Sequence, residues 1–302
     1  MQNGKKSLTA LMASFSRAYH SKNNSAKIFD DFLAESLLTP EEYEAIAQNL
    51  INGADFFGGT SIKDFSEAEK LRWIVQTQLA PTPLARACYC EEALLNEIKI
   101  GCKQYVMLGA GMDTFAFRHK ELLERIKVFE LDHPDTQTFK MERIHLAEWD
   151  LPEGLTVVPV DFNREDFSDH LIRFGYDRTK KTFFSWLGVT YYLSKKNISN
   201  MLKTLSEISS EGSALVFDYA DENLFDSKVP RVNHMVGMAK GAGEPMQSCF
   251  TYTELEKILA DSGFLIYEHL SPEEIGERFF RSREDDYKAF EHIHYVLVVR
   301  KG

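Results

Sequence analysis

Five short runs of β-branched and aromatic residues along the middle of the chain constrain its fold more than any other feature. They cover residues 104–108, 126–132, 155–161, 181–188 and 213–220. Helical patterns lie between several of them, such as residues 194–210, with Ser194 as the cap. Short, almost continuously hydrophobic strands that alternate with helices are typical of a parallel sheet covered on both faces. The pattern predicts an α/β protein with a doubly wound sheet.

Two more strands are expected near the C-terminus, at 264–270 and 294–301, after a glycine-rich stretch at 237–245 that we interpret as a mobile loop. A helix capped by Thr251 precedes the first of them. His292 and His294 look like a metal pair, but they fall in a period-2 strand pattern without further ligands nearby in the sequence. We interpret both as strand residues and predict no metal site.

The N-terminal third has a helical period instead, at 7–21, 28–38, 39–51 and 64–80, and a further helix at 84–98 leads into the first strand. Thr39 and Pro40 mark a clear helix start, and Pro81 and Pro83 are expected to end the helix at 64–80. No repeat, low-complexity tract or proline-rich linker is found. We therefore expect one domain over 1–302, with a helical cap region at 1–85 and an α/β core at 86–302.

Composition excludes some partners. The chain has 35 basic and 46 acidic residues, a net charge of -11, which argues against a broad electrostatic grip on nucleic acid or an anionic membrane. No run reaches the roughly 18 apolar residues of a membrane span, and the N-terminus lacks a signal-peptide core. The four cysteines form no paired CxxC set and are expected to be reduced, buried thiols. The expected location is the cytoplasm.

A glycine-rich loop follows the first predicted strand. Gly109 and Gly111 stand at its carboxyl end, where missing side chains let a ligand approach the backbone. A dinucleotide fingerprint would have a third glycine at position 114, but Thr114 stands there. The loop therefore favours a ligand without a pyrophosphate over NAD, although plain turn chemistry remains an alternative.

The next two strands end in acids. Glu130 and Asp132 lie about 20 residues beyond the glycines, where such folds present a carboxylate to ribose hydroxyls, and one of the two can point to the ligand. Asp161 and Phe162 end the third strand. The Asp161 carboxylate can accept a hydrogen bond from an exocyclic amine, and the Phe162 ring would lie near the base. Helix capping is the alternative for each acid alone. Arg86 could clamp the carboxylate of an adenosyl ligand that bears an amino acid, or be a surface arginine.

Several segments together carry a family resemblance, namely 7–21, 106–118, 128–134, 158–162, 183–193 and 243–245. In this order they resemble the leucine carboxyl methyltransferase superfamily, in particular its bacterial S-adenosylmethionine-dependent O-methyltransferases. The resemblance implies a class I methyltransferase (Rossmann-like) fold, a seven-stranded sheet whose last strand is antiparallel, and an N-terminal helical part that covers the cofactor. S-adenosyl-L-methionine is the implied cofactor.

The resemblance also implies roles for single residues. It assigns Arg86 to the methionine carboxylate, Gly109 to the methionine portion, Asp132 to ribose, and Asp161 with Phe162 to adenine. Gly111 belongs to the same loop and is expected at the cofactor. Two departures are visible: Leu187 stands where the family has a glutamate before a small residue, and the family's RTR segment is RAC here, with only Arg86 kept. Tyr192 matches a family tyrosine and is expected to line the acceptor pocket, with core packing as the alternative.

The predicted function is methyl transfer to an oxygen, a carboxylate or hydroxyl, of a small molecule or peptide terminus. A carboxylate acceptor needs no base, whereas an alcohol or phenol would need one; Tyr191, Tyr192, Tyr219 and His234 are available, without a recognisable dyad. Two alternatives remain open: a catalytically inactive S-adenosylmethionine-binding protein that acts as a partner or sensor, and an NAD(P)-dependent oxidoreductase. The sequence also leaves open whether the chain forms a homodimer.

Overall fold

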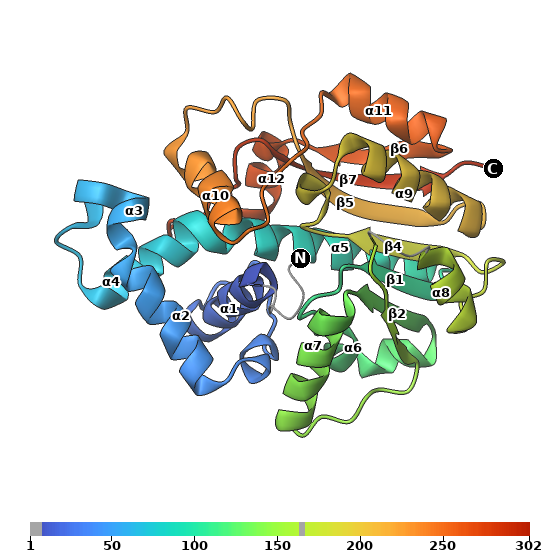
Figure 1. Ribbon diagram of the computed structural model, residues 1–302, viewed down its shortest axis with the longest axis horizontal. Helices are drawn as coiled ribbons and strands as arrows, with labels where there is room; N and C mark the ends of the chain where they lie inside the picture. The colour runs from blue at the N-terminus through green and yellow to red at the C-terminus, as the bar shows by residue number, and fades with distance from the viewer. Residues whose placement is uncertain (1–7, 163–166) are drawn as a thin grey trace.

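The chain folds around one seven-stranded sheet in the order β3-β2-β1-β4-β5-β7-β6 (Figure 1). The structure is a computed structural model and describes residues 8–162 and 167–302. The strands are β1 (Gln104–Leu108), β2 (Lys127–Asp132), β3 (Leu155–Pro159), β4 (Thr182–Trp186), β5 (Ala214–Ala220), β6 (Phe264–Leu270) and β7 (Ile293–Arg300). The strands from β1 to β5 pair in parallel, and β7 runs antiparallel to both β5 and β6. The predicted doubly wound sheet with an antiparallel last strand is confirmed.

The sheet is buried on both faces, as its continuous hydrophobic strands indicate. Along β1, Tyr105 and Met107 join one hydrophobic cluster, while Val106 and Leu108 join the other. The first cluster includes residues of α5 (Pro81–Lys99), α7 (Pro134–Leu146) and α12 (Pro272–Phe279). The second includes residues of α8 (Phe167–Arg173), α9 (Lys195–Ile208) and α11 (Tyr252–Asp261). This period-2 division gives three layers, with helices on either side of the sheet.

The strand order reverses between β1 and β4, because the chain winds outward from β1 to β2 and β3 and then returns to β4 on the other side. At such a point the helices leave toward opposite faces, and a crevice opens beyond the carboxyl ends of the strands. The loops after β1, β2, β3 and β4 all reach this edge. They are the loops that carry the predicted site residues.

The N-terminal helices gather at one side of the sheet, with α5 running from them toward β4 (Figure 1). They are α1 (Leu8–Asn23), α2 (Pro40–Asn52), α3 (Ala54–Gly58) and α4 (Glu67–Ile74), with short turns η1 (Ala34–Leu37) and η2 (Gly59–Ile62) and a π-helical turn η3 (Val75–Leu79). Thr39 caps α2 in a capping box with Glu42, as its sequence predicts. The remaining helical segments are α6 (Phe115–Arg118), η4 (Lys120–Glu124), η5 (Thr190–Tyr192) and α10 (Pro230–Gly241).

Two local predictions are wrong. In the segment 28–38 only the turn Ala34–Leu37 is helical, because Asp31 is drawn into long-range hydrogen bonds with other parts of the chain. The helix expected at 64–80 ends at Leu79, before Pro81, as predicted, and Pro81 also opens α5, which suits a residue without an N–H at the first helical position. The glycine-rich segment 237–245 is not all loop, since α10 continues to Gly241. The division expected at residues 85 and 86 falls inside α5 and stays a prediction.

Asp31 connects the N-terminal helices to the loop that follows β1. Its carboxylate accepts hydrogen bonds from Arg17 Nε of α1 at 2.8 Å and from Thr114 Oγ1 at 2.6 Å, and Arg118 Nε lies 3.5 Å away. Only 2% of its side chain is exposed. Burial opposes its ionisation, but the two guanidinium groups hold the pKa of Asp31 below its usual range. A buried, paired carboxylate therefore fixes where the helical region meets the sheet.

We expect Asp31→Asn to lower the free energy of unfolding at neutral pH by about 3 kcal/mol, because it leaves the guanidinium of Arg17 without its anion, while Arg118 keeps Glu91. The carboxylate's contribution is complete above its unfolded pKa near 3.8 and is lost as the pH falls through its lower folded pKa. Urea unfolding should therefore show the two proteins converging in acid. Asp30→Asn is the matched control, since Asp30 accepts a hydrogen bond from Ser21 in an exposed contact, and a pH-independent difference at Asp31 would contradict this account.

Candidate active site

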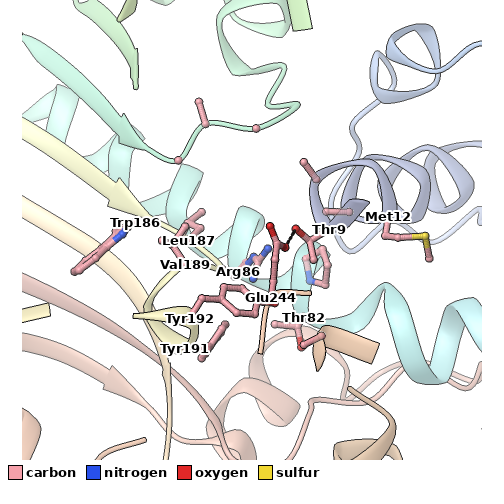
Figure 2. Close-up of a pocket in the computed structure, with 18 of the residues that line it drawn as sticks. Thr9, Met12, Thr82, Arg86, Trp186, Leu187, Val189, Tyr191, Tyr192 and Glu244 are labelled. Carbon is pink, nitrogen blue, oxygen red and sulfur yellow. Dashed lines mark hydrogen bonds between the residues drawn. The ribbon is translucent and has the colours of Figure 1, made fainter. Parts of the chain in front are cut away.

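A cavity of about 940 Å³ opens at the carboxyl ends of the parallel strands (Figure 2). The eight residues expected from the sequence at the cofactor or acceptor all line it, namely Arg86, Gly109, Gly111, Asp132, Asp161, Phe162, Leu187 and Tyr192. They come from α5 and from the ends of four strands, so residues spread over more than a hundred positions meet in one crevice. The volume is at the upper end of the roughly 300–1,000 Å³ that ligand sites occupy. It leaves room for a second molecule beside a nucleoside-sized ligand.

The floor of the cavity is bare backbone at Gly109. This residue has a φ of +80°, and a Cβ built on it would lie 2.9 Å from Cγ2 of Val189. The N–H groups of Gly109 and Ala110 both donate to the carbonyl of Leu131, at 2.9 and 3.0 Å. Only glycine fits this conformation and this space, so the loop after β1 can lie close to a ligand.

Asp132 ends β2 at the edge of the cavity. Its carboxylate accepts the N–H of Gly111 at 2.6 Å and the N–H of His133 at 2.7 Å. Burial raises the pKa of Asp132, while these two backbone donors favour its charged form. Glu130, on the same face of the strand, turns to Lys140 of α7 at 2.6 Å and does not line the cavity. One acid of the pair thus faces the crevice and the other packs, as the sequence predicts.

Asp161 and Phe162 follow β3 on the neighbouring side of the cavity. Asp161 Oδ2 lies 4.0 Å from Nε2 of His133, and 19% of its side chain is exposed. The ring of Phe162 packs against Phe167 of α8 at 5.9 Å between centroids. A carboxylate and a flat apolar surface therefore lie side by side near Asp132, an arrangement suited to an aromatic ring with an exocyclic amine.

Arg86 reaches the cavity from α5 and is held by a buried acid that the sequence analysis missed. Its Nη1 lies 3.0 Å from Oδ2 of Asp218, a residue of β5 whose side chain is fully buried. The same carboxylate accepts the N–H of Gly188 at 2.6 Å and the hydroxyl of Tyr191. The sequence did contain a signal for this pair. Asp218 is a carboxylate in the middle of an otherwise hydrophobic strand, and a buried charge needs a partner.

Leu187 and Tyr192 line the cavity from either side of the turn after β4. Burial raises the pKa of Tyr192 to about 12, with Arg86 opposing that effect. Its hydroxyl is therefore neutral at physiological pH and is a poor base. Of the other candidates, Tyr191 is bonded to Asp218, and among the described residues Tyr219 and His234 are absent from the cavity lining.

The side of the cavity opposite the strand ends is built from α1, α10 and the loop 242–247, and we call it the outer wall. Its lining residues include Thr9, Met12, Met235, Met238, Glu244 and Met246. Thr9 Oγ1 donates to Glu244 Oε2 at 2.8 Å, which joins α1 to the loop (Figure 2). Gln247 N–H donates to the Tyr191 carbonyl at 2.6 Å, which joins the loop to the turn after β4. The segment 237–245 thus lines the cavity, with the end of α10 taking part.

His292 and His294 lie away from this cavity, at the start of β7. His294 is a strand residue as predicted, but His292 precedes the strand with a φ of +67°. Both contact the carboxylate of Asp221, at 3.0 and 3.2 Å, so an acid that the sequence pattern did not indicate lies between them. Within residues 8–162 and 167–302, no group of three or more His, Cys, Asp or Glu side chains has the arrangement of a metal site.

Gly188→Ala should weaken S-adenosylmethionine binding, the ligand that the resemblance implies, by at least about tenfold, since a misplaced charged hydrogen bond costs about 1.5–3 kcal/mol. Gly188 has a φ of +70°, and a Cβ there would lie 2.5 Å from the Arg86 guanidinium, which must then move off Asp218. The control is Gly212→Ala, whose φ of +74° is similar but whose Cβ would meet only Lys181 Cε at 4.0 Å. Calorimetry should find normal affinity for the control; equal losses would show that backbone strain alone is responsible.

Comparison with known proteins identifies the family. A family model described as leucine carboxyl methyltransferase matches residues 10–206, which is more than half of the chain. A Bacillus subtilis (strain 168) protein named "Putative S-adenosyl-L-methionine-dependent methyltransferase YktD" is 48% identical over 305 residues and covers 100% of both chains. A Mycobacterium avium (strain 104) protein named "Putative S-adenosyl-L-methionine-dependent methyltransferase" is 27% identical over 217 residues, which cover 70% of this chain and 66% of its own.

Solved structures agree on the fold. A DUF574 family protein from Streptomyces avermitilis superimposes with a TM-score of 0.54 at 15% identity, over 84% of this chain and 97% of its own. A structure titled a putative methyltransferase from Thermobifida fusca superimposes with a TM-score of 0.51 at 16% identity, over 85% of this chain and 95% of its own. At these identities the likeness concerns the class I methyltransferase fold alone. The family match and the relative that aligns from end to end go further: the chain belongs to the leucine carboxyl methyltransferase family and is an S-adenosylmethionine-dependent methyltransferase.

Proposed function

We propose that this protein transfers the methyl group of S-adenosylmethionine to an oxygen atom of a small molecule or a peptide terminus. The observation that carries the proposal is the meeting of the bare Gly109 backbone, the strand-end acids and Arg86 in one cavity with room for two molecules. Membership of the leucine carboxyl methyltransferase family supports oxygen as the receiving atom. The acceptor itself, a carboxylate or a hydroxyl, is a separate question.

The residues fit the parts of the methyl donor in chain order. We propose that Asp132 accepts hydrogen bonds from the ribose hydroxyls and that Asp161, with Phe162, binds the adenine. Arg86 would hold the methionine carboxylate in a charge-assisted hydrogen bond. Gly109 and Gly111 would let the backbone approach the methionine and ribose portions. Leu187, in place of the family's glutamate, would offer the donor an apolar contact.

Methyl transfer depends more on the relative position of donor and acceptor than on acid or base groups. Bound S-adenosylmethionine supplies an electrophilic methyl on a sulfonium, and displacement there needs the acceptor oxygen in line with the breaking bond. The cavity walls contribute by holding both molecules in that geometry and by keeping water out. Tyr192, neutral at physiological pH because burial raises its pKa to about 12, would orient an acceptor through its hydroxyl.

The oxidoreductase alternative is poorly supported by the loop after β1. Position 114, where a dinucleotide fingerprint has its third glycine, holds a fully buried threonine whose hydroxyl donates to Asp31 at 2.6 Å. A side chain therefore stands where the fingerprint has a bare glycine for close packing of helix against strand. A cytoplasmic location, the absence of a nucleic-acid or membrane partner, and a homodimer all stay predictions.

The receiving atom can be identified from the stability of the labelled product. The protein would be incubated with methyl-labelled S-adenosylmethionine and separate panels of carboxylic acids, phenols, alcohols and amines. Carboxylate products release labelled methanol in mild alkali, whereas methyl ethers and methylamines do not. We expect label only in the oxygen panels. Label confined to amines would refute the proposal, and donor binding without transfer to any panel would favour the inactive binding protein.

Asp132→Asn should weaken binding of S-adenosylmethionine by about 10- to 100-fold, because charge-assisted hydrogen bonds to the ribose are worth about 1.5–3 kcal/mol. The asparagine is isosteric and its amide oxygen can still accept one backbone N–H. The control is Glu130→Gln on the same strand, whose partner is Lys140 rather than the cavity. Calorimetry should find nearly normal affinity for the control, and unchanged affinity for Asp132→Asn would mean that the ribose lies elsewhere.

A further inference from the structure

The outer wall of the cavity is chemically unlike the strand ends. Four methionines, Met12, Met235, Met238 and Met246, line it together with the buried ring of Phe290. Methionine is unbranched and polarizable, so it adapts to irregular apolar molecules. The strand ends carry the acids and glycines that suit the adenosyl donor, which leaves this apolar region for the body of the acceptor.

The cations that line the cavity are already paired with buried acids. Arg86 pairs with Asp218 and Arg17 pairs with Asp31, so neither adds a net positive charge to the space. Arg86 is also the guanidinium proposed for the methionine carboxylate. In the described part of the chain, no lysine or arginine forms an ion pair with Glu244. Among the residues that the structure describes, an anionic acceptor would therefore meet a largely apolar wall with one acid and no lysine or arginine left unpaired.

Glu244 stands at the boundary between the outer wall and the turn after β4. Thr9 donates a hydrogen bond to Glu244 Oε2 at 2.8 Å. Burial raises the pKa of Tyr192, and the negative charge of Glu244 adds to that rise. Among the residues that the structure describes, none donates a hydrogen bond to its Oε1. Figure 2 draws Glu244 among Arg86, Tyr192 and Thr9 in the cavity. One carboxylate oxygen is thus anchored and the other can accept a proton.

We infer that the acceptor is an apolar molecule that bears a hydroxyl group, and that Glu244 is the catalytic residue that takes the hydroxyl proton. The inference rests on the proposed function and deepens it. The acceptor oxygen forms a bond to the methyl carbon as the carbon–sulfur bond breaks, and the sulfur keeps that electron pair as a neutral thioether. The hydroxyl proton passes to Oε1 of Glu244, so charge is balanced at every atom.

Charge decides between a hydroxyl and a carboxylate acceptor. In protein saturated with S-adenosylhomocysteine, whose sulfur is neutral, a carboxylate brought to this wall would meet the like charge of Glu244, and the arginines that line the cavity are already paired, which disfavours binding. A phenol or alcohol is neutral, donates to the free oxygen of Glu244, and needs the base that a carboxylate does not. The two acceptor classes therefore predict opposite effects of removing the Glu244 charge.

The test uses two probes with the same apolar body, 4-butylphenol and 4-butylbenzoate, and the wild-type and Glu244→Gln proteins. Glutamine keeps the shape and can still accept from Thr9 through its amide oxygen, so the change removes the charge and the proton acceptor. Binding of each probe to protein saturated with S-adenosylhomocysteine would be measured by calorimetry. Transfer of labelled methyl to each probe would be measured as a function of pH.

We expect the wild-type protein to bind the phenol at least about tenfold more tightly than the benzoate. Glu244→Gln should reduce the ratio of the two dissociation constants by a similar factor. Transfer to the phenol should fall at least about a hundredfold in the variant, the usual range for a lost general base, with the loss partly recovered at high pH. Glu256→Gln, at an exposed acid of α11 outside the cavity lining, is the matched control and should keep the wild-type activity and probe affinities.

Tighter binding of the benzoate, binding of neither probe, or a ratio that Glu244→Gln leaves unchanged would overturn the inference. A variant that loses affinity for S-adenosylmethionine would also overturn it, because Glu244 would then contact the donor's ammonium. These results are distinguishable from failure of the proposed function, in which the wild-type protein would methylate no oxygen in either probe or in the acceptor panels.

Discussion

The buried carboxylate of Asp218 is the interaction on which the cavity depends most. It lies in the middle of β5 with no exposed side-chain surface, where an unpaired charge would be very costly. Its partners come from α5, from the backbone after β4 and from η5, through Arg86, Gly188 and Tyr191. All three groups must reach the same carboxylate. The positions of α5, the turn after β4 and η5 are therefore fixed relative to one another, and together they set the shape of the crevice.

A second buried acid does the same for the helical region. Asp31 belongs to a stretch with little regular structure, and Arg17, Thr114 and Arg118 hold it against the loop that follows β1. The loop after β1 and the N-terminal helices are therefore connected through charge as well as through the hydrophobic core. Since α1 also supplies Thr9 and Met12 to the outer wall, the same contact helps to set the distance between the two sides of the cavity.

The division of charge within the cavity gives each side its own chemistry. Strand-end acids and a glycine backbone would face the donor, while the arginines are held by buried carboxylates and the outer wall has Glu244 as its one acid among the described residues. A low-dielectric cavity strengthens every remaining electrostatic contact, so the Glu244 carboxylate there has more influence on the choice of acceptor than it would at the surface.

The sequence by itself determined the doubly wound sheet through its strand and helix periods, and it indicated the glycines and strand-end acids that a parallel sheet brings to one edge. The antiparallel last strand and the places of Leu187 and Tyr192 came from the family resemblance that the sequence carries. Only the tertiary structure decided that residues 28–33 are not helical, that α10 extends to Gly241, that Asp218 holds Arg86, and that Glu244 lines the cavity. Each of these depends on partners distant along the chain, such as Asp31 with Thr114 or Glu244 with Thr9, and no local pattern reports a contact between residues that far apart.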